Sequence, residues 1–280
     1  MGNSATKLKN KWNQLRQAKE ALLATNFYNF ETLQGILKAA SITKRPLILQ
    51  LTRGSVEYMG LPVARALAES ALNYFDVEGW IHLDHGDSYE LVAGCLDAGF
   101  DSVMIDASEK PFSENVKITK SVVKLAEKYG ASVEAELGYI AKLGQHTSKI
   151  GFTEPEEAKL FVEETGVDAL AVAIGSAHGF YKEEPRLDLE RLTKINEVTN
   201  AALVLHGASG IPHPILQEAI QRGICKVNLA TEIKNIFMKT LKGQVIENDE
   251  IDLRKVFPPA TASVTSMVIN KLESIHSKID

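Results

Sequence analysis

Several features are scarce in this sequence, and each absence narrows what the chain can be. It has only two cysteines, Cys95 and Cys225, which are far apart and follow no C-x-x-C pattern. Neither a disulfide framework nor a cysteine metal motif is therefore expected. No apolar run approaches the roughly 20 residues of a membrane-spanning helix. The polar, basic N-terminus lacks the apolar core of a signal peptide. We expect a cytoplasmic chain with no membrane partner.

A surplus of basic residues is also missing. Lys and Arg number 31 against 36 Asp and Glu, which gives a formal net charge of −5. Nucleic-acid binding depends on clustered basic side chains, so we expect no nucleic-acid partner. The hydrophobic share of 45% is sufficient for a large core. A length of 280 residues fits one (β/α)8 domain of about 250 residues with extra helices. We therefore expect residues 1–280 to form a single domain.

Eight apolar, strand-like runs are spaced along the chain. They are Ala21–Asn26, Pro46–Leu51, Gly79–Asp84, Asp101–Asp106, Ala131–Leu137, Asp168–Ile174, Ala202–Gly207 and Ile224–Ala230. Between them lie segments with apolar residues three or four apart, which is the period of an amphipathic helix. Ser113 and Thr153 precede two of these segments as helix start signals. Alternating strands and helices favour a parallel sheet. Further helices are expected at Ala5–Glu20 and Ala260–Ser277.

Chemically useful residues stand at or just past the carboxyl end of almost every run. They are Asn26, Thr52, Asp84 with His85, Asp106, Glu136, His178, His206 and Asn228. Functional groups after every strand, rather than at one switch point, favour a closed (β/α)8 TIM barrel over an open doubly wound sheet. Because barrel enzymes work where their strands end, we expect these side chains to meet in one mouth.

Histidine is the natural donor for a metal in such a mouth. Of seven histidines, His85, His178 and His206 end strands in this interpretation. A catalytic zinc typically takes three protein ligands and leaves one position open. A single histidine is more often a hydrogen-bonded structural residue, but three at strand ends favour one shared zinc ion. His82 is expected in the core or beside the ligands, and His213 and His276 are expected to be solvated.

Six motifs extend this interpretation to a family. They are HLDHG (82–86), SVMIDAS (102–108), SVEAELG (132–138), AVAIGSAHGFY (171–181), LVLHGASGIP (203–212) and KVNLATE (226–232). Together, in this order and spacing, they resemble the motifs of the class II, zinc-dependent ketose-bisphosphate aldolases, which include the fructose- and tagatose-bisphosphate aldolases. The resemblance implies reversible aldol cleavage of a phosphorylated ketose to dihydroxyacetone phosphate and an aldehyde. It also implies a homodimer or homotetramer, and it leaves open a monovalent cation as a further cofactor.

The resemblance also assigns roles to residues of this chain. It implies that His85, His178 and His206 bind zinc, and that Asp84 carries the proton at the oxygen of the bond being broken. Asp106 and Glu136 correspond to carboxylates near the metal, either supporting its ligands or offering an alternative ion position. Substrate contacts are implied at these positions: Asn26, Thr52, Gly179, Gly207, Ser209, Asn228, Thr231 and Lys271.

The chain departs from the family pattern in the long segment Tyr139–Phe152, which lies where barrel enzymes often carry a lid. The family usually has a glutamate in this segment for proton exchange. This chain has no carboxylate between Glu136 and Glu154. Gln145 and His146 are the candidate substitutes, and His146 suits the role better because its ordinary pKa fits proton transfer near neutral pH. The alternative interpretation of His146 is a solvated loop histidine.

Fructose-specific members of the family often carry Asp where this chain has Ala230. In this respect the chain resembles tagatose-type sequences. Two alternatives therefore stay open: a relative acting on a different ketose phosphate, and a metal- or ligand-binding member that has lost turnover.

Overall fold

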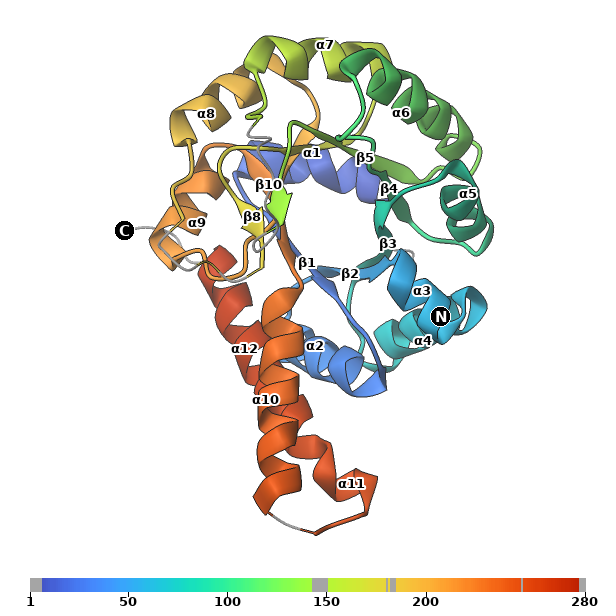
Figure 1. The fold of residues 1–280 in the computed structure, drawn as a ribbon, viewed down its shortest axis with the longest axis vertical. Coiled ribbons are helices and arrows are strands. Elements are labelled where there is room, and N and C mark those ends of the chain that lie inside the picture. The colour runs from blue at the N-terminus through green and yellow to red at the C-terminus, as the bar shows by residue number, and fades with distance from the viewer. Residues whose placement is uncertain (1–6, 143–150, 180, 182–184, 248, 277–280) are drawn as a thin grey trace.

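The computed structural model describes residues 7–142, 151–179, 181, 185–247 and 249–276. Its centre is a closed barrel of parallel strands in the order β1-β10-β9-β7-β5-β4-β3-β2 (Figure 1). The strands are β1 (Leu22–Asn26), β2 (Leu47–Thr52), β3 (Gly79–Gly86), β4 (Ser102–Ile105), β5 (Ser132–Leu137), β7 (Ala169–Val172), β9 (Ala202–Leu205) and β10 (Ile224–Leu229). Each overlaps one of the eight predicted runs, with ends that differ by one or two residues, so the predicted (β/α)8 barrel is confirmed.

Helices form a ring outside the strands (Figure 1). They are α2 (Phe30–Thr43), α4 (Leu61–Tyr74), α5 (Tyr89–Asp97), α6 (Phe112–Ala126), α7 (Pro155–Thr165), α8 (Leu189–Val198), α9 (His213–Gln221) and α12 (Pro258–His276). Helix α10 (Thr231–Glu247) runs outward beside α12 (Figure 1). Side-chain oxygens of Asn29, Ser88 and Asp188 cap three of the ring helices by accepting a hydrogen bond from a backbone N–H. None of the helices in the described ranges is long and apolar enough to cross a membrane.

The helix start signals predicted at Ser113 and Thr153 are wrong. Helix α6 begins at Phe112, so Ser113 lies inside its first turn. Helix α7 begins after Glu154, and Thr153 makes no cap. Instead, the Thr153 hydroxyl donates to the Leu137 carbonyl and accepts from the Ala173 N–H at 2.8 Å. The buried Thr153 side chain therefore links the loop before α7 to the ends of β5 and β7. A threonine just before a helix predicts a cap instead, so the sequence did not reveal this role.

Four short elements were not expected from the sequence. Helix α3 (Arg53–Met59) follows β2 directly, and the Thr52 side chain caps it. Helix α11 (Leu253–Val256) spans four residues. Above the barrel, β6 (Ala141–Lys142) pairs with β8 (Ala177–His178) in a separate two-stranded sheet. Segments of this length carry too few residues for a periodic pattern to reveal them.

Helix α12 (Pro258–His276) packs against α2, and the C-terminal half of α10 projects with α11 away from the barrel (Figure 1). Gly35 permits the close approach, since a Cβ there would lie 2.8 Å from Val264 Cγ1. The prediction that His276 is solvated is wrong, because its ring is half-buried at the end of α12 and burial lowers its pKa to about 4. His213 is exposed as expected.

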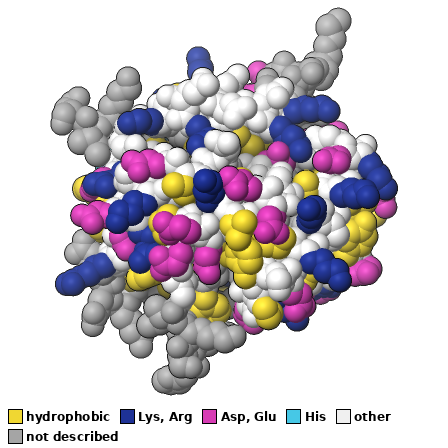
Figure 2. Space-filling view, turned by 90° about the horizontal axis from the view of Figure 1, so that it is seen from above, with side chains coloured by type: hydrophobic (Ala, Val, Ile, Leu, Met, Phe, Trp, Pro, Cys, Tyr) yellow, Lys and Arg dark blue, Asp and Glu magenta, His cyan; other side chains and the backbone are white. Residues whose placement is uncertain are grey.

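Apolar side chains are exposed at the tip of this projecting arm, which we define as residues 242–247 and 249–257. Val245, Ile246, Ile251 and Leu253 are each at least 61% exposed. By contrast, the face of the molecule in Figure 2 has Lys and Arg side chains interspersed with Asp and Glu, and only scattered apolar ones. A group of exposed apolar side chains on one protrusion is typical of a protein–protein contact.

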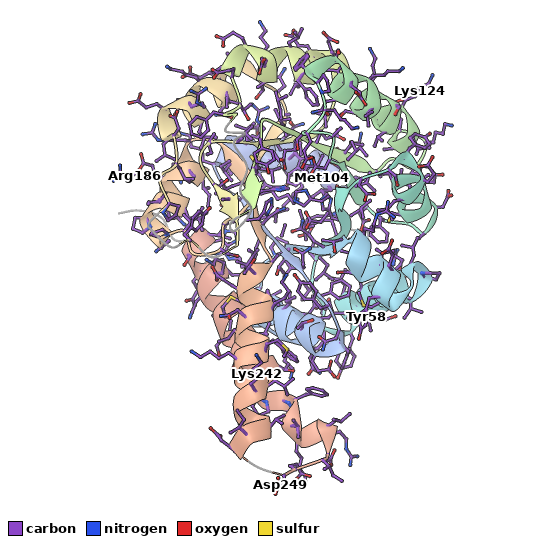
Figure 3. The ribbon with its side chains drawn as sticks, viewed as in Figure 1. Tyr58, Met104, Lys124, Arg186, Lys242 and Asp249 are labelled. Carbon is purple, nitrogen blue, oxygen red and sulfur yellow. The ribbon has the colours of Figure 1, made fainter. Side chains whose placement is uncertain are left out.

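Side chains fill the barrel, with Met104 among those lying inside the ring of strands (Figure 3). Helix α1 (Leu8–Ala18) covers the amino ends of the strands. Its Leu8, Trp12 and Leu15 pack on residues near the strand starts, among them Leu22, Ile48, Trp80 and Ala202. The Trp12 indole also donates a hydrogen bond of 2.9 Å to the buried Ser132 hydroxyl. This helix closes one end of the barrel, so only the carboxyl ends remain for a site.

We predict that Trp12→Ala lowers the free energy of unfolding by about 3–5 kcal/mol, because it leaves a cavity under the strands and an unpaired Ser132. Urea denaturation measures the change. Gln14→Ala, at an exposed position of the same helix, is the control and should shift stability by less than about 0.5 kcal/mol. Equal effects of the two substitutions would contradict the role given to α1.

Candidate active site

A cavity of about 230 Å³ lies at the carboxyl ends of the strands, and we call it the mouth. Its lining includes many of the residues expected from the sequence: Asn26, Thr52, Asp84, His85, His178, Gly179, Gly207, Ser209, Asn228 and Thr231. These residues come from the ends of strands and the loops that follow them. The convergence of distant segments that the sequence predicted is therefore present.

The end of β3 contributes two neighbouring side chains to the mouth, Asp84 and His85. In a regular strand, consecutive side chains point to opposite faces. Here the register between β3 and β4 shifts between Leu83 and Gly86, and His85 has a φ of 50°. A left-handed conformation costs a non-glycine residue roughly 1–2 kcal/mol. This local irregularity turns both side chains toward the same cavity, and backbone strain of this kind is typical of functional sites.

Three histidines meet beside Asp84. The ring centroids are 5.0 Å apart for His85 and His178, 4.7 Å for His85 and His206, and 5.7 Å for His178 and His206. One nitrogen from each ring lies within 4.8 Å of the other two. His85 Nε2 is 3.1 Å from His206 Nδ1, so two ring nitrogens face each other closely. Three imidazole nitrogens in such a cluster are a donor set that suits one zinc ion.

Asp106 and Glu136 stand next to these rings. His85 Nδ1 donates a hydrogen bond of 2.7 Å to Asp106 Oδ2, which leaves Nε2 facing the cluster. Burial disfavours the imidazolium, but the nearby Asp84 and Asp106 carboxylates outweigh it and raise the pKa of His85 to about 9. Asp106 also accepts from the Ser108 hydroxyl at 2.7 Å. These bonds hold the pKa of Asp106 well below its usual value despite burial.

Glu136 is buried at the edge of the histidine cluster. Burial and the nearby Asp106 carboxylate raise the pKa of Glu136 to about 8. Its Oε2 lies 3.6 Å from His206 Nδ1 and has no hydrogen-bond partner among the described residues. A second group of potential metal donors consists of His85, Asp106 and Glu136. A buried acceptor without a donor among the described residues, next to the His85 and His206 rings, fits a site that holds a cation.

Asp84 is held by two amides. Asn26 Nδ2 donates to Asp84 Oδ2 at 2.9 Å, and Asn228 Nδ2 lies 3.4 Å from Oδ1. Burial opposes ionisation, but the neighbouring His85 and the Asn26 hydrogen bond hold the pKa of Asp84 below its ordinary value. His85 Nε2 lies 4.0 Å from Asp84 Oδ1. The carboxylate is thus oriented beside the histidine cluster, at a distance from which it can reach a molecule bound there.

The two loops that carry His178 and His206 contain small residues at the mouth, Gly179 and Gly207. Gly207 has a φ of 67°, and a Cβ there would lie 2.3 Å from the Ala177 carbonyl oxygen. The Tyr181 hydroxyl joins the two loops, since it accepts from Ala177 N–H at 2.7 Å and donates to the Gly207 carbonyl at 2.9 Å. This clasp fixes the segment that precedes His178 against the segment that follows His206.

Among the predicted site residues that the structure describes, Asp106, Glu136 and His206 stand beside the mouth in the two donor groups and do not line it, and Lys271 belongs to neither the lining nor those groups. Lys271 Nζ lies 3.3 Å from Glu232 Oε1. Glu232 in turn accepts from the Gly210 N–H at 2.7 Å. Lys271 therefore supports the Gly210 loop from behind through Glu232. His146 lies outside the described residues, so its proposed role stays a prediction.

Tyr28 and Lys234 line the mouth but were missed from the sequence. Lys234 Nζ lies 5.4 Å from the Tyr28 ring centroid, a cation–π distance. Both residues, with Thr52, also line an adjoining cavity of about 530 Å³ that extends toward Tyr58 and Phe237. The sequence feature that could have identified them is their nearness to predicted site residues. Tyr28 follows Asn26 by two residues, and Lys234 follows Thr231 by three.

Comparison with known proteins shows that nearly the whole chain is similar to aldolases. Residues 6–279 match the family described as fructose-bisphosphate aldolase class-II. A fructose-bisphosphate aldolase of Giardia intestinalis is 38% identical over 292 residues, covering 94% of this chain and 90% of that protein. The YdjI aldolase of Escherichia coli K12 has a similar structure, with a TM-score of 0.86, 32% identity, and coverage of 96% of this chain and 97% of that one.

A more distant structure shares the fold. Fructose-bisphosphate aldolase of Campylobacter jejuni has a TM-score of 0.82 at 21% identity, and the match covers 96% of this chain and 93% of that chain. At this identity the likeness concerns the barrel alone.

We predict that Tyr181→Phe lowers the free energy of unfolding by about 1–2 kcal/mol, because the Ala177 N–H and the Gly207 carbonyl lose their shared partner. Chemical denaturation measures the loss. Tyr74→Phe removes a hydroxyl from a side chain that is 82% exposed and serves as the control, with an expected change below about 0.5 kcal/mol. An unchanged stability of Tyr181→Phe would mean that the clasp does not hold the two loops.

Proposed function

The chain belongs to the class II fructose-bisphosphate aldolase family, and from this premise we propose that it cleaves a phosphorylated ketose of the fructose or tagatose 1,6-bisphosphate type. The products are dihydroxyacetone phosphate and an aldehyde, and the reaction is reversible. The observation that carries the proposal is the cluster of His85, His178 and His206 at the mouth, next to Asp84. This arrangement combines a metal donor set with a carboxylate placed for proton transfer.

The proposed ligands of a zinc ion are His85, His178 and His206. The fit rests on the mutual distances of their nitrogens and on the unpartnered Glu136 Oε2 beside them. A divalent ion held there would act as a Lewis acid toward the carbonyl oxygen of the ketose. Asp106 holds the His85 ring by its Nδ1–H, so that Nε2 faces the site.

Asp84 is the proposed proton carrier. As the carbon–carbon bond breaks, the hydroxyl on the aldehyde-side carbon must lose its proton, and a carboxylate within reach can take it. Asn26 and Asn228 fix the two oxygens of Asp84, so the group is aimed before the substrate arrives. In the condensation direction the same carboxyl returns the proton to the new hydroxyl oxygen.

We place the phosphate of the dihydroxyacetone phosphate half against the loops that follow His178 and His206 and the start of α10. Ser209 and Thr231 offer hydroxyls there, and Gly179 and Gly207 line the same part of the mouth without side chains that would keep a phosphate from their backbone. Thr231 begins the 17-residue helix α10, whose amino end favours an anion. The aldehyde half then extends past Asn26 and Thr52 toward Tyr28 and Lys234.

The size of the adjoining cavity favours a second candidate substrate. Its volume of about 530 Å³, next to Tyr28 and Lys234, leaves room for an aldehyde larger than a three-carbon phosphate. A different ketose phosphate, cleaved by the same residues, would use that room. Lys234 is the only Lys or Arg among the described residues that line the two cavities, so an anionic group on the aldehyde half would meet it there.

We further propose that the enzyme is a cytoplasmic homodimer or homotetramer. The exposed apolar tip of the projecting arm supports self-association, since such side chains are usually covered in a complex. Cys95 and Cys225 are both free and buried, which suits a reducing compartment.

A coupled assay for dihydroxyacetone phosphate tests the function. Fructose 1,6-bisphosphate, tagatose 1,6-bisphosphate and fructose 1-phosphate are each offered to the enzyme. At least one should be cleaved, a chelator should stop the reaction, and added zinc should restore it. His178→Ala should stay inactive after zinc is added, because one of its ligands is missing. Cleavage that survives complete metal removal would contradict the mechanism, and no cleavage of any phosphorylated ketose would favour a member without turnover.

We predict that Asp84→Asn retains bound zinc and the fold but loses about 10²–10⁴-fold in kcat, the usual contribution of a positioned acid or base. Steady-state kinetics and metal analysis on the same preparation check this. Asp87→Asn removes an exposed carboxylate that pairs with Arg53 and is the matched control. Near-normal turnover of Asp84→Asn would remove Asp84 from the mechanism.

A further inference from the structure

A group of charged and polar side chains is buried inside the barrel, directly beneath the histidine cluster. Lys226 on β10 is 0% exposed and Glu134 on β5 is 1% exposed. His82 on β3 and Ser102 on β4 are equally buried beside them. We call these four residues the interior polar group. None of them lines the mouth, and the mechanism above uses none of them.

Hydrogen bonds connect this group to His206. Lys226 Nζ donates to Glu134 Oε2 at 2.6 Å, and His206 Nε2 donates to Glu134 Oε1 at 2.9 Å. Lys226 Nζ also lies 3.4 Å from His82 Nε2. On the far side, His82 Nδ1 is 2.9 Å from the Ser102 hydroxyl oxygen. Each oxygen of Glu134 thus has its own partner, with the ammonium on one side and the imidazole on the other.

The bond to Glu134 decides which nitrogen of His206 is free. A carboxylate accepts hydrogen bonds, so the His206 proton lies on Nε2 and the lone pair on Nδ1. That Nδ1 faces His85 Nε2 at 3.1 Å, inside the cluster. His85 is arranged the same way by Asp106, which accepts from the nitrogen that faces away. Carboxylates that hold the outer nitrogen of a metal-binding histidine fix its tautomer and orientation.

Stability gives little reason for a lysine at this place. Burying an ion pair is costly, and replacing one with apolar side chains is often neutral or stabilising. The neighbouring interior positions on β1, β7 and β9 are occupied by apolar residues such as Ala24, Ala171 and Val204. A lysine and a glutamate in the same interior therefore point to a task that apolar side chains cannot perform.

We propose that Lys226 is a positioning residue that acts through Glu134: it binds one oxygen of Glu134 so that the other accepts from His206 Nε2 and His206 Nδ1 faces the metal site. The proposal rests on the proposed function, because it concerns a ligand of the proposed zinc site. Lysine suits the task because an ammonium can only donate. Its ammonium group binds Glu134 Oε2, which leaves Glu134 Oε1 to accept from the His206 imidazole.

Paired substitutions test the proposal. In Glu134→Gln the single carbonyl oxygen is drawn to Lys226, and the NH₂ group is turned toward His206 Nε2, which favours the wrong tautomer. In Lys226→Met the carboxylate loses the donor that orients it. In the double variant no ammonium competes for the carbonyl, so the side-chain amide at position 134 can accept from His206. Its NH₂ group then turns toward His82 Nε2, which lies 3.7 Å from Glu134 Oε2 in the unsubstituted chain.

We therefore expect both single variants to bind zinc about 10–100-fold more weakly, the usual effect of losing an outer partner of a ligand. The double variant should regain most of the affinity. Competition with a chromophoric chelator measures affinity, and the visible absorption of the Co²⁺-loaded protein reports ligand geometry independently of turnover. The Co²⁺ spectrum should change in the single variants and return in the double variant. Ser132→Ala, which removes another buried hydrogen bond from β5, is the control and should leave both readouts unchanged.

Wild-type affinity and spectrum in Lys226→Met would overturn the proposal, and so would a double variant as weak as the single ones. If one single variant does not fold, the other still gives the comparison with the double variant. A wild-type chain that binds no zinc or Co²⁺ would overturn this inference together with the proposed metal site. A chain that binds zinc and shows the expected pattern but cleaves no ketose phosphate would contradict the proposed function alone.

Discussion

Closure of the parallel sheet is the constraint on which the rest of this molecule depends. β10 pairs with β1 in register, with Ala24 beside Asn228 and Leu22 beside Lys226. This pairing brings the last strand back to the first, so Asn228 reaches Asp84 across the mouth although the two are 144 residues apart. An open sheet would leave β1 and β10 on opposite edges. The amides from both strands that hold Asp84 exist together only because the barrel closes.

The closed interior has two parts with different requirements. Near the amino ends of the strands, α1 and residues such as Ile48 and Trp80 form an apolar core, as burial favours. Nearer the mouth, Glu134, Lys226 and His82 are buried as polar groups that must satisfy one another. The polar layer therefore lies buried and hydrogen-bonded to His206, directly beneath a site that handles charge.

The sequence predicted the eight strands well, because each is a buried apolar run that ends in polar residues. It also predicted most of the lining of the mouth, since strand ends of a barrel must converge. It could not predict the hydrogen bond between Lys226 and Glu134. Whether the Lys226 side chain points into the barrel depends on a register irregularity between Ile224 and Lys226 on β10. Nor could the sequence place Lys271, whose position depends on how α12 packs near Glu232. Packing, rather than local pattern, decided those positions.

Strain and hydrogen bonding at β3 support one another. His85 adopts a left-handed backbone that an isolated strand would not retain, and the surroundings must therefore hold it there. Its Nδ1 bond to Asp106 does so from one side, and the return of the chain to the sheet at Gly86, which lies beside Ile105, does so from the other. A Cβ at Gly86 would lie 2.5 Å from the Met104 carbonyl oxygen, so only glycine permits this return. Glycine at position 86 is thus part of what lets two consecutive residues, Asp84 and His85, share one mouth.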